Sequence, residues 1–244
     1  MPDSPFERTQ SGPTDPVTSL PALSALSALC AEPTPPTRRR WLRQGVWGAA
    51  LVAAPALVRP AAAQSSTLPA VPTPSQTEGP YYPVEFPRDS DADLLRNGML
   101  RYTQGQAVWV EGRVTDTQGV PLAGGTVEIW QCDAKGHYHH PGDGGKAAEA
   151  FQGFGRVVLG RDGQYRFRTI RPAPYTGRTP HIHFKVRLPG RELLTTQMYV
   201  AGDAGNARDY LWSRLSEKDR AALTVRFAPA ADGVRGEFPI VVQT

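Results

Sequence analysis

The stretch Ala107-Val-Trp-Val-Glu-Gly-Arg-Val114 places valines at 108, 110 and 114, all on the same alternation, and after Thr115 the stretch Asp116-Thr-Gln-Gly119 follows. Alternation with a period of two puts the apolar side chains on one face of a β-strand. Asp and Gly close after such a run favour a turn. The pattern predicts a half-buried strand that ends in a turn, which is the repeating unit of an all-β domain.

Similar short runs recur along the rest of the chain. We expect strands at 107–114, 126–132, 164–169, 181–188, 193–200, 223–227 and 237–242. One short helix is expected at 207–215, with a further turn at 216–222. Many short strands with turn residues between them indicate an all-β fold, a two-sheet β-sandwich. The segments 138–162 and 170–180 are rich in Gly and Pro, and we expect them to be long loops that carry a mononuclear metal site.

The first 76 residues are expected to lie outside this domain. Residues 1–36 are rich in Pro, Ser and Thr and predict a disordered extension. Residues 37–63 resemble a twin-arginine signal peptide that ends in Ala61-Ala-Ala63, a pattern typical of cleavage sites. Residues 64–76 have the composition of a linker, and 77–244 form the predicted domain. A membrane anchor or an amphipathic arm is the alternative for the apolar run, but the cleavage pattern favours a periplasmic or secreted protein without a stable anchor.

The charge balance and the cysteines narrow the classes of protein. The formal net charge is +4 at pH 7, from 27 Lys and Arg against 23 Asp and Glu. No basic stripe is present, so we do not expect nucleic acid as a partner. Cys30 falls within the N-terminal extension, and Cys132 is alone in the predicted domain. We therefore expect no internal disulfide in the domain, even in an oxidising compartment.

All five histidines fall in two groups, His137-Tyr-His-His140 and His181-Ile-His183. Histidine is the side chain that most often binds metals in proteins. Residues two apart on a strand share a face, so His181 and His183 are expected to project side by side. A His-x-His pair alone is weak evidence for a metal site, because surfaces also carry it.

Tyr138 and Tyr175 decide which metal such a site would hold. A phenol has a pKa near 10, so a weakly acidic metal does not bind it as phenolate at neutral pH. Ferric iron can, whereas zinc favours Cys, His and carboxylate ligands. Two phenolates would keep iron oxidised, so the metal would activate an organic substrate rather than O2. Taken singly, each tyrosine is better explained as an ordinary packed aromatic.

Several separated stretches carry a family resemblance. They are Gln76-Thr-Glu-Gly-Pro-Tyr-Tyr82, Gly125-Thr-Val-Glu-Ile-Trp-Gln-Cys-Asp-Ala-Lys-Gly-His-Tyr-His-His140, Tyr165-Arg-Phe-Arg-Thr-Ile-Arg-Pro-Ala-Pro-Tyr175, Arg178-Thr-Pro-His-Ile-His-Phe184 and Thr195-Thr-Gln-Met-Tyr199. In this order they resemble the intradiol ring-cleaving dioxygenases, most closely the protocatechuate 3,4-dioxygenase type. The resemblance covers roughly residues 76–242. Several separated motifs would rarely occur in the same order by chance.

The resemblance implies a cofactor and a reaction. Its match implies one non-haem Fe(III) ion held by Tyr138, Tyr175, His181 and His183, with Tyr175 and His183 as the axial pair. It implies that a small aromatic diol and O2 are the reactants. The ring would open between its two hydroxyl-bearing carbons and give a muconate-type diacid. We also expect a homo-oligomer.

Further residues match positions of the family's active site. Arg178 matches an arginine that stabilises negative charge on the substrate, an electrostatic role. Gln197 matches a glutamine of the site. Thr77, Pro80 and Tyr81 match positions that line the aromatic pocket, although Gly-Pro-Tyr is also an ordinary turn sequence.

Two other functions remain open at this point. A transthyretin-like binding sandwich would suit the turn and strand at 116–127, but it leaves the tyrosines and histidines as a coincidence. An exported zinc or copper hydrolase would use the histidines alone and leave the tyrosines idle.

The other three histidines flank Tyr138. In an extended chain His137 and His139 point away from the face of Tyr138, whereas His140 shares that face.

Overall fold

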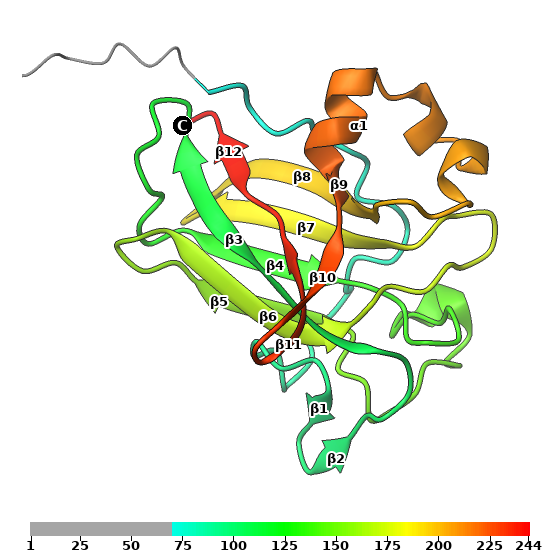
Figure 1. Cartoon of the computed structure of the whole chain (residues 1–244). Helices are drawn as coiled ribbons and strands as arrows, with labels where there is room; N and C mark the ends of the chain where they lie inside the picture. The colour runs from blue at the N-terminus through cyan, green and yellow to red at the C-terminus, as the bar shows by residue number, and fades with distance from the viewer. Residues whose placement is uncertain (1–69) are drawn as a thin grey trace, which may run out of the picture. The chain divides into compact units, whose positions relative to one another are not determined.

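The computed structural model describes residues 70–244. Two five-stranded sheets form a β-sandwich in this part of the chain, as the alternating runs predict (Figure 1). The expected extension, the signal peptide and most of the linker lie outside the described residues. Residues 70–76, the last part of the expected linker, bond to the domain through the amides of Ala70, Thr73 and Gln76.

The first sheet is built around the ten-residue strand β3 (Ala107–Asp116). Strand β6 (Gln164–Ile170) pairs with β3 in antiparallel orientation. Strands β11 (Gly233–Glu237) and β12 (Ile240–Val242) pair in parallel with successive parts of β3, and β10 (Phe227–Ala230) pairs with β11.

The second sheet positions the site. Its strand order is β5 (Phe154–Val158), β4 (Thr126–Trp130), β7 (His181–Leu188), β8 (Arg191–Val200) and β9 (Thr224–Val225). Strands β4 and β8 flank β7 in antiparallel register, so β7 is a central strand. A separate small hairpin joins β1 (Arg96–Asn97) to β2 (Leu100–Arg101).

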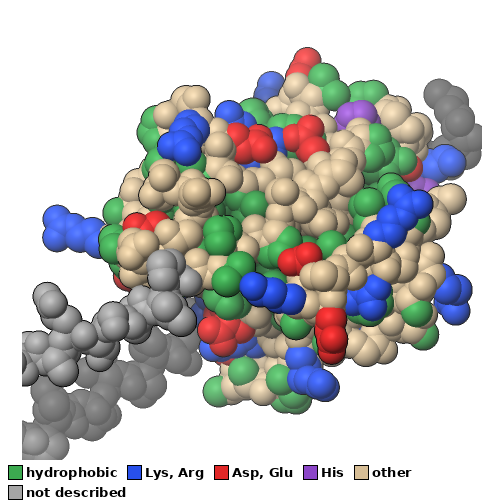
Figure 2. Space-filling view, turned by 90° about the horizontal axis from the view of Figure 1, so that it is seen from above, with side chains coloured by type: hydrophobic (Ala, Val, Ile, Leu, Met, Phe, Trp, Pro, Cys, Tyr) green, Lys and Arg blue, Asp and Glu red, His purple; other side chains and the backbone are tan. Residues whose placement is uncertain are grey.

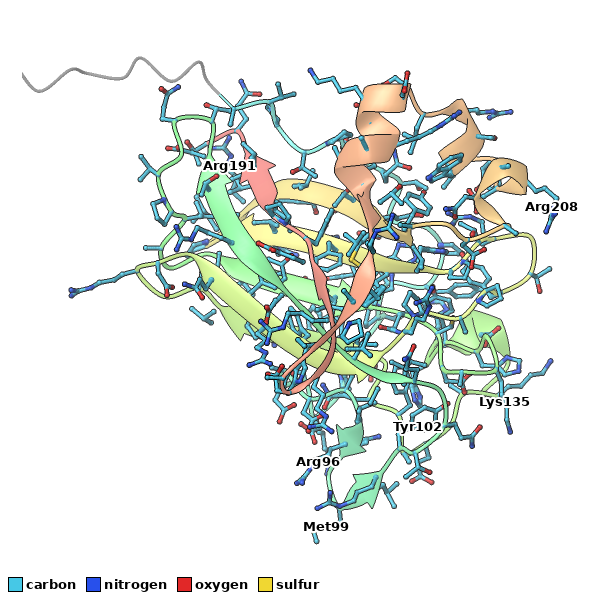
Figure 3. All side chains as sticks on the ribbon, viewed as in Figure 1. Arg96, Met99, Tyr102, Lys135, Arg191 and Arg208 are labelled. Carbon is cyan, nitrogen blue, oxygen red and sulfur yellow. The ribbon has the colours of Figure 1, made fainter. Side chains whose placement is uncertain are left out.

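The core lies between the two sheets. Val108 and Val110 of β3 belong to one buried apolar cluster with Ile182 and Phe184 of β7. Burying a side chain of this size contributes about 1.5–3 kcal/mol. Because successive residues of a strand face opposite ways, this packing leaves the odd-numbered residues of β7 on the outer face of the sheet. Figure 3 shows side chains filling the space between the sheets.

The prediction of a helix at 207–215 is wrong. That stretch forms two 3-10 turns, η2 (Asn206–Arg208) and η3 (Trp212–Arg214). In the described part of the chain the one α-helix is α1 (Glu217–Leu223), where we expected only a turn. The carboxylate of Asp209 accepts backbone N–H bonds at the start of η3, which separates the two turns.

Two other expectations need correction. The loop predicted at 138–162 contains the 3-10 turn η1 (Pro141–Asp143) and the strand β5. Gly155 interrupts the apolar alternation by which β5 could have been recognised. Glycine is needed there because a Cβ would lie 2.6 Å from Leu94 Cδ1. The strand predicted at 223–227 is in fact β9 and the start of β10, which belong to different sheets.

The surface of residues 70–244 carries both signs of charge. Basic and acidic side chains are interspersed on the face that Figure 2 shows. Within these residues, no helix has the length and apolar character needed to cross a membrane.

Candidate metal centre

His181 and His183 begin β7 and point away from the core. The strand register places Trp130 of β4 on one side of His183 and Gln197 of β8 on the other. The Nε2 atoms of the two histidines lie 3.1 Å apart, and both side chains are buried. Ile182 between them belongs to the core cluster, as the alternation of side chains along a strand requires.

Neighbouring groups fix the orientation of both imidazoles. His181 Nδ1 lies 2.7 Å from the carbonyl oxygen of Thr179, so Nδ1 carries the proton and Nε2 keeps its lone pair. The ring of His183 stacks on Trp130, with 4.7 Å between centroids and 9° between planes. Each ring is therefore held in one orientation before any ligand arrives.

Both histidines are neutral at pH 7. Burial and the nearby Arg178 lower the pKa of His181 to about 3. Burial, followed by the charges of His181 and Arg178, holds the pKa of His183 well below its ordinary value. Neutral imidazole is the form that binds a metal ion.

Tyr138 and Tyr175 come to this end of the sheet from two loops. Their ring centroids lie 5.2 Å apart, with the planes at 90°. Gly136 allows the loops to approach, because a Cβ there would stand 2.8 Å from the carbonyl oxygen of Pro174 and its φ is +84°. The backbone amide of Tyr138 donates to Asp143 Oδ2 at 2.8 Å, which fixes the loop at the tyrosine itself.

The tyrosines adjoin the histidines. The ring of Tyr175 lies 5.4 Å from that of His181, and the ring of Tyr138 lies 6.1 Å from that of His183. The four predicted ligands, drawn from two loops and one strand, therefore form one cluster. Lys135, in a loop, and Arg208, at the end of η2, are labelled in Figure 3 and lie at this end of the sandwich.

The phenols need a strong cation to ionise. Burial raises the pKa of Tyr138 well above its ordinary value, and burial also raises that of Tyr175. Within residues 70–244 the Tyr138 hydroxyl is buried without a hydrogen-bond partner. An unsatisfied buried group costs about 1–3 kcal/mol, so a ligand that satisfied this oxygen would recover that cost.

The residues present fit a trivalent metal better than zinc. Two nitrogen ligands at right angles, with metal–nitrogen bonds of about 2.1 Å, stand about 3 Å apart. The separation of the His181 and His183 Nε2 atoms agrees with that value. Across the described residues, no three His, Cys, Asp or Glu side chains gather as a metal site. A zinc ion here would thus lack its preferred third ligand, whereas ferric iron accepts phenolate.

Arg178 lies beside this cluster in a network of fixed hydrogen bonds. Its Nε donates to Asp209 Oδ2 at 2.8 Å, and one Nη donates to Gln197 Oε1 at 2.7 Å. Its other Nη is 3.5 Å from the Tyr175 hydroxyl. Arg178, Gln197 and Asp209 are all buried. A permanent positive charge is therefore held next to Tyr175, where negative charge on a bound substrate would be stabilised.

The 76–82 segment crosses the outer face of the sheet above the cluster. Tyr81 stacks on Tyr138 with 4.6 Å between ring centroids and 20° between planes. The carbonyl oxygen of Thr77 accepts a 2.8 Å hydrogen bond from Gln197 Nε2. Pro80 lies between them in sequence and is exposed. The three predicted pocket residues thus belong to one segment next to the cluster.

The other three histidines make contacts outside the cluster. His137 Nδ1 lies 3.3 Å from Asp143 Oδ2, and His139 Nε2 lies 2.5 Å from the carbonyl oxygen of Phe151. His140 Nδ1 accepts from the amide of Gly142, and its ring meets the edge of Tyr81.

Sequence reasoning missed Asp209, Trp130 and the Thr179 carbonyl. Trp130 could have been found, because it lies in a quoted motif and a pairing of the predicted strands places it opposite His183. No signal identified Asp209, which is 31 residues from its partner Arg178.

Several dioxygenases match most of the described part of the chain in sequence. Residues 77–244 match the family model described as Dioxygenase. Hydroxyquinol 1,2-dioxygenase of Nocardioides simplex is 34% identical in an alignment of 149 residues that covers 54% of this chain and 48% of the relative. The beta chain of protocatechuate 3,4-dioxygenase of Burkholderia cepacia is 34% identical in an alignment of 177 residues that covers 66% of this chain and 75% of that one. The chain spans about half the length of the hydroxyquinol dioxygenases it matches.

Solved structures agree with this assignment. The dioxygenase domain of a carbohydrate-binding fusion protein from Streptomyces sp. SirexAA-E is 34% identical, with a TM-score of 0.57 over 71% of this chain and 99% of that domain. Catechol 1,2-dioxygenase from Acinetobacter sp. ADP1 is 28% identical, with a TM-score of 0.56 over 70% of this chain and 62% of that one. The chain therefore belongs to the intradiol ring-cleavage dioxygenase family.

Proposed function

We propose that this protein is a non-haem Fe(III) dioxygenase that opens a small catechol-type ring between its two hydroxyl-bearing carbons. O2 is the second reactant, and a muconate-type diacid is the product. The observation that carries the proposal is the convergence of two buried tyrosines and two neutral histidines beside a buried arginine. A binding module without catalysis gives no reason for a buried Tyr138 hydroxyl that has no hydrogen-bond partner within residues 70–244.

His181 and His183 would bind iron through neutral nitrogens, and Tyr138 and Tyr175 would bind it as phenolates. When bound, Fe(III) would supply the Lewis acidity that holds the deprotonated diol and makes its ring reactive toward O2. Every other requirement falls on side chains of this chain, which must accept protons, stabilise charge and enclose the ring.

Tyr175 is the better placed of the two tyrosines to take up a proton. Its side chain is half-buried, whereas Tyr138 is buried under Tyr81. As a phenolate, Tyr175 would accept one proton from the incoming diol, because burial raises its pKa. Tyr138 would stay in place as a permanent ligand.

Arg178 would stabilise negative charge on the substrate oxygen. Asp209 and Gln197 hold the guanidinium in place, so it need not reorganise during the reaction. Gln197 also donates to the Thr77 carbonyl, which couples the arginine to the segment that would cover the ring.

Oxygen uptake by the iron-loaded protein tests this function. We expect catechol, protocatechuate or hydroxyquinol to consume one O2 per diol, and both labelled atoms of 18O2 to appear in the diacid. Absence of uptake with every diol tested, or cleavage outside the diol, would contradict the proposal. Zinc-loaded protein is the control and should consume no O2.

We also propose export and self-association. The twin-arginine motif of residues 37–63 supports transfer of the folded protein to the periplasm or beyond. Replacing Arg38 and Arg39 with Lys should retain the precursor in the cytoplasm, and continued export would argue against that route. The family resemblance supports a homo-oligomer, which light scattering on the purified protein would test.

A further inference from the structure

Lys185 is a buried cation on the outer face of β7, two residues after His183, and 4% of its side chain is exposed. A buried ammonium requires nearby groups that offset its lost hydration. Lys185 forms an ion pair with Glu78 and lies 3.2 Å from Glu192 Oε2. Its Nζ also stands 3.9 Å from the centroid of the Tyr82 ring, which is a cation–π contact.

Two of these partners delimit the stretch that covers the candidate site. Glu78 begins it, Tyr82 ends it, and Tyr81 between them stacks on the predicted ligand Tyr138. A single lysine therefore contacts both ends of the five residues that cross the site. Its third partner, Glu192, lies on β8 and not on the stretch.

The same stretch passes close to a second predicted ligand. A Cβ on Gly79 would stand 3.4 Å from Cε1 of His183, and the φ of Gly79 is +74°. Just before it, Gln76 and Thr77 are tied to β8 by hydrogen bonds of their main chain. The main chain thus secures the start of the 76–82 segment, and side chains hold the part that lies over the ligands.

We propose that Lys185 is a positioning residue that fastens Glu78 and Tyr82 and thereby fixes the 78–82 stretch over the metal ligands. The diol pocket of the proposed function, on which this inference rests, would then owe its shape to a residue that touches neither metal nor substrate. Loosening the 78–82 stretch should weaken binding of the diol more than it slows the chemical step.

Glu78 and Glu192 provide a matched pair of variants. Both carboxylates face Lys185, and their side chains are 44% and 46% exposed. Glu78→Gln and Glu192→Gln each remove one negative charge from the same ammonium. The covering stretch loses a fastening in Glu78→Gln alone. Lys185→Met removes both fastenings while keeping a long apolar side chain, and the glutamate pair decides the question if that variant does not fold.

Amide hydrogen exchange on the metal-free, full-length protein measures the fastening directly. We expect exchange across residues 76–82 to be about tenfold faster in Glu78→Gln and to stay within about twofold of wild type in Glu192→Gln. On iron-loaded protein, Glu78→Gln should raise the KM for the diol at least about fivefold with kcat within about twofold.

Equal exchange in the two glutamate variants would overturn the inference, and so would faster exchange in Glu78→Gln with an unchanged KM. A wild-type protein that bound no ferric iron would overturn the proposed function instead. The exchange comparison uses no metal, so it would still decide whether Lys185 fastens the stretch.

Discussion

Asp209 accepts a 2.8 Å hydrogen bond from Nε of Arg178, and both side chains are almost fully buried. The same carboxylate oxygen accepts the backbone amide of Thr179 at 2.9 Å. The carbonyl of Thr179 in turn orients His181. One acid in the segment between β8 and α1 therefore holds both the candidate charge-stabilising arginine and the residue that sets the tautomer of a predicted ligand.

Replacing Asp209 with Asn should destabilise the fold. Removal of one partner of a buried ion pair leaves a charge uncompensated, and we expect the free energy of unfolding to fall by about 3–5 kcal/mol. Denaturant unfolding of the metal-free protein measures this. Asp232→Asn, which breaks exposed pairs with Arg166 and Arg235, is the control and should cost less. Equal losses in the two variants would argue against a special role for Asp209.

The Asp209 carboxyl also predicts a pH dependence. Burial alone would raise its pKa, but hydrogen bonds from the amides of Trp212 and Thr179 and from Arg178 hold it below the ordinary 3.8. A depressed folded-state pKa stabilises the protein above the unfolded-state pKa, and this contribution is lost as the pH falls through the folded-state pKa. Wild type should therefore lose stability below about pH 4 more steeply than Asp209→Asn. Parallel acid unfolding curves would contradict this.

Arg178→Ala should separate metal binding from chemistry. Arg178 contributes charge beside Tyr175 but is not a predicted ligand, so iron should stay bound. Loss of one electrostatic stabiliser should lower kcat by about 10²–10³-fold. Iron content and turnover of the purified variant check both points, with the exposed Arg208→Ala as control. Loss of iron from Arg178→Ala would make the arginine a structural residue.

Tyr138→Phe should stabilise the metal-free protein while destroying its metal site. The buried hydroxyl of Tyr138 has no partner within residues 70–244, so its removal should raise the free energy of unfolding by about 1 kcal/mol. Tyr165→Phe is the matched control: its buried hydroxyl donates to the carbonyl of Phe238, and its removal should destabilise the protein. If the Tyr138→Phe protein were destabilised and still bound iron normally, Tyr138 would not be a metal ligand.

Tyr175→Phe should alter the colour of the iron-loaded protein. Charge transfer from phenolate to ferric iron should make wild type wine-red, so removal of one phenol should bleach or shift the absorption and slow turnover. Visible spectra before and after the change check this, with Tyr165→Phe expected to keep the wild-type colour. An unchanged spectrum and rate in Tyr175→Phe would show that this tyrosine does not bind the metal.

Local patterning was enough to predict the sandwich. The alternation of valines identified β3, and the predicted strand at 181–188 has the bounds of β7. It failed where tertiary contacts control the backbone. Asp209 divides the predicted helix at 207–215 into two turns, and close packing against Leu94 requires the glycine that obscures β5.

The four predicted ligands could be named because motif and residue chemistry agree, and the fold brings them together. Their supporting residues were harder to find. Asp209 and Lys185 bond to partners 31 and 107 residues away, and nothing in their local sequence marks those contacts.

A crystal structure of the iron-loaded protein, with iron located by anomalous scattering, tests the account most directly. We expect a single ion within bonding distance of the hydroxyl oxygens of Tyr138 and Tyr175 and the Nε2 atoms of His181 and His183. An ion bound by the histidines with either tyrosine oxygen out of reach would contradict the account.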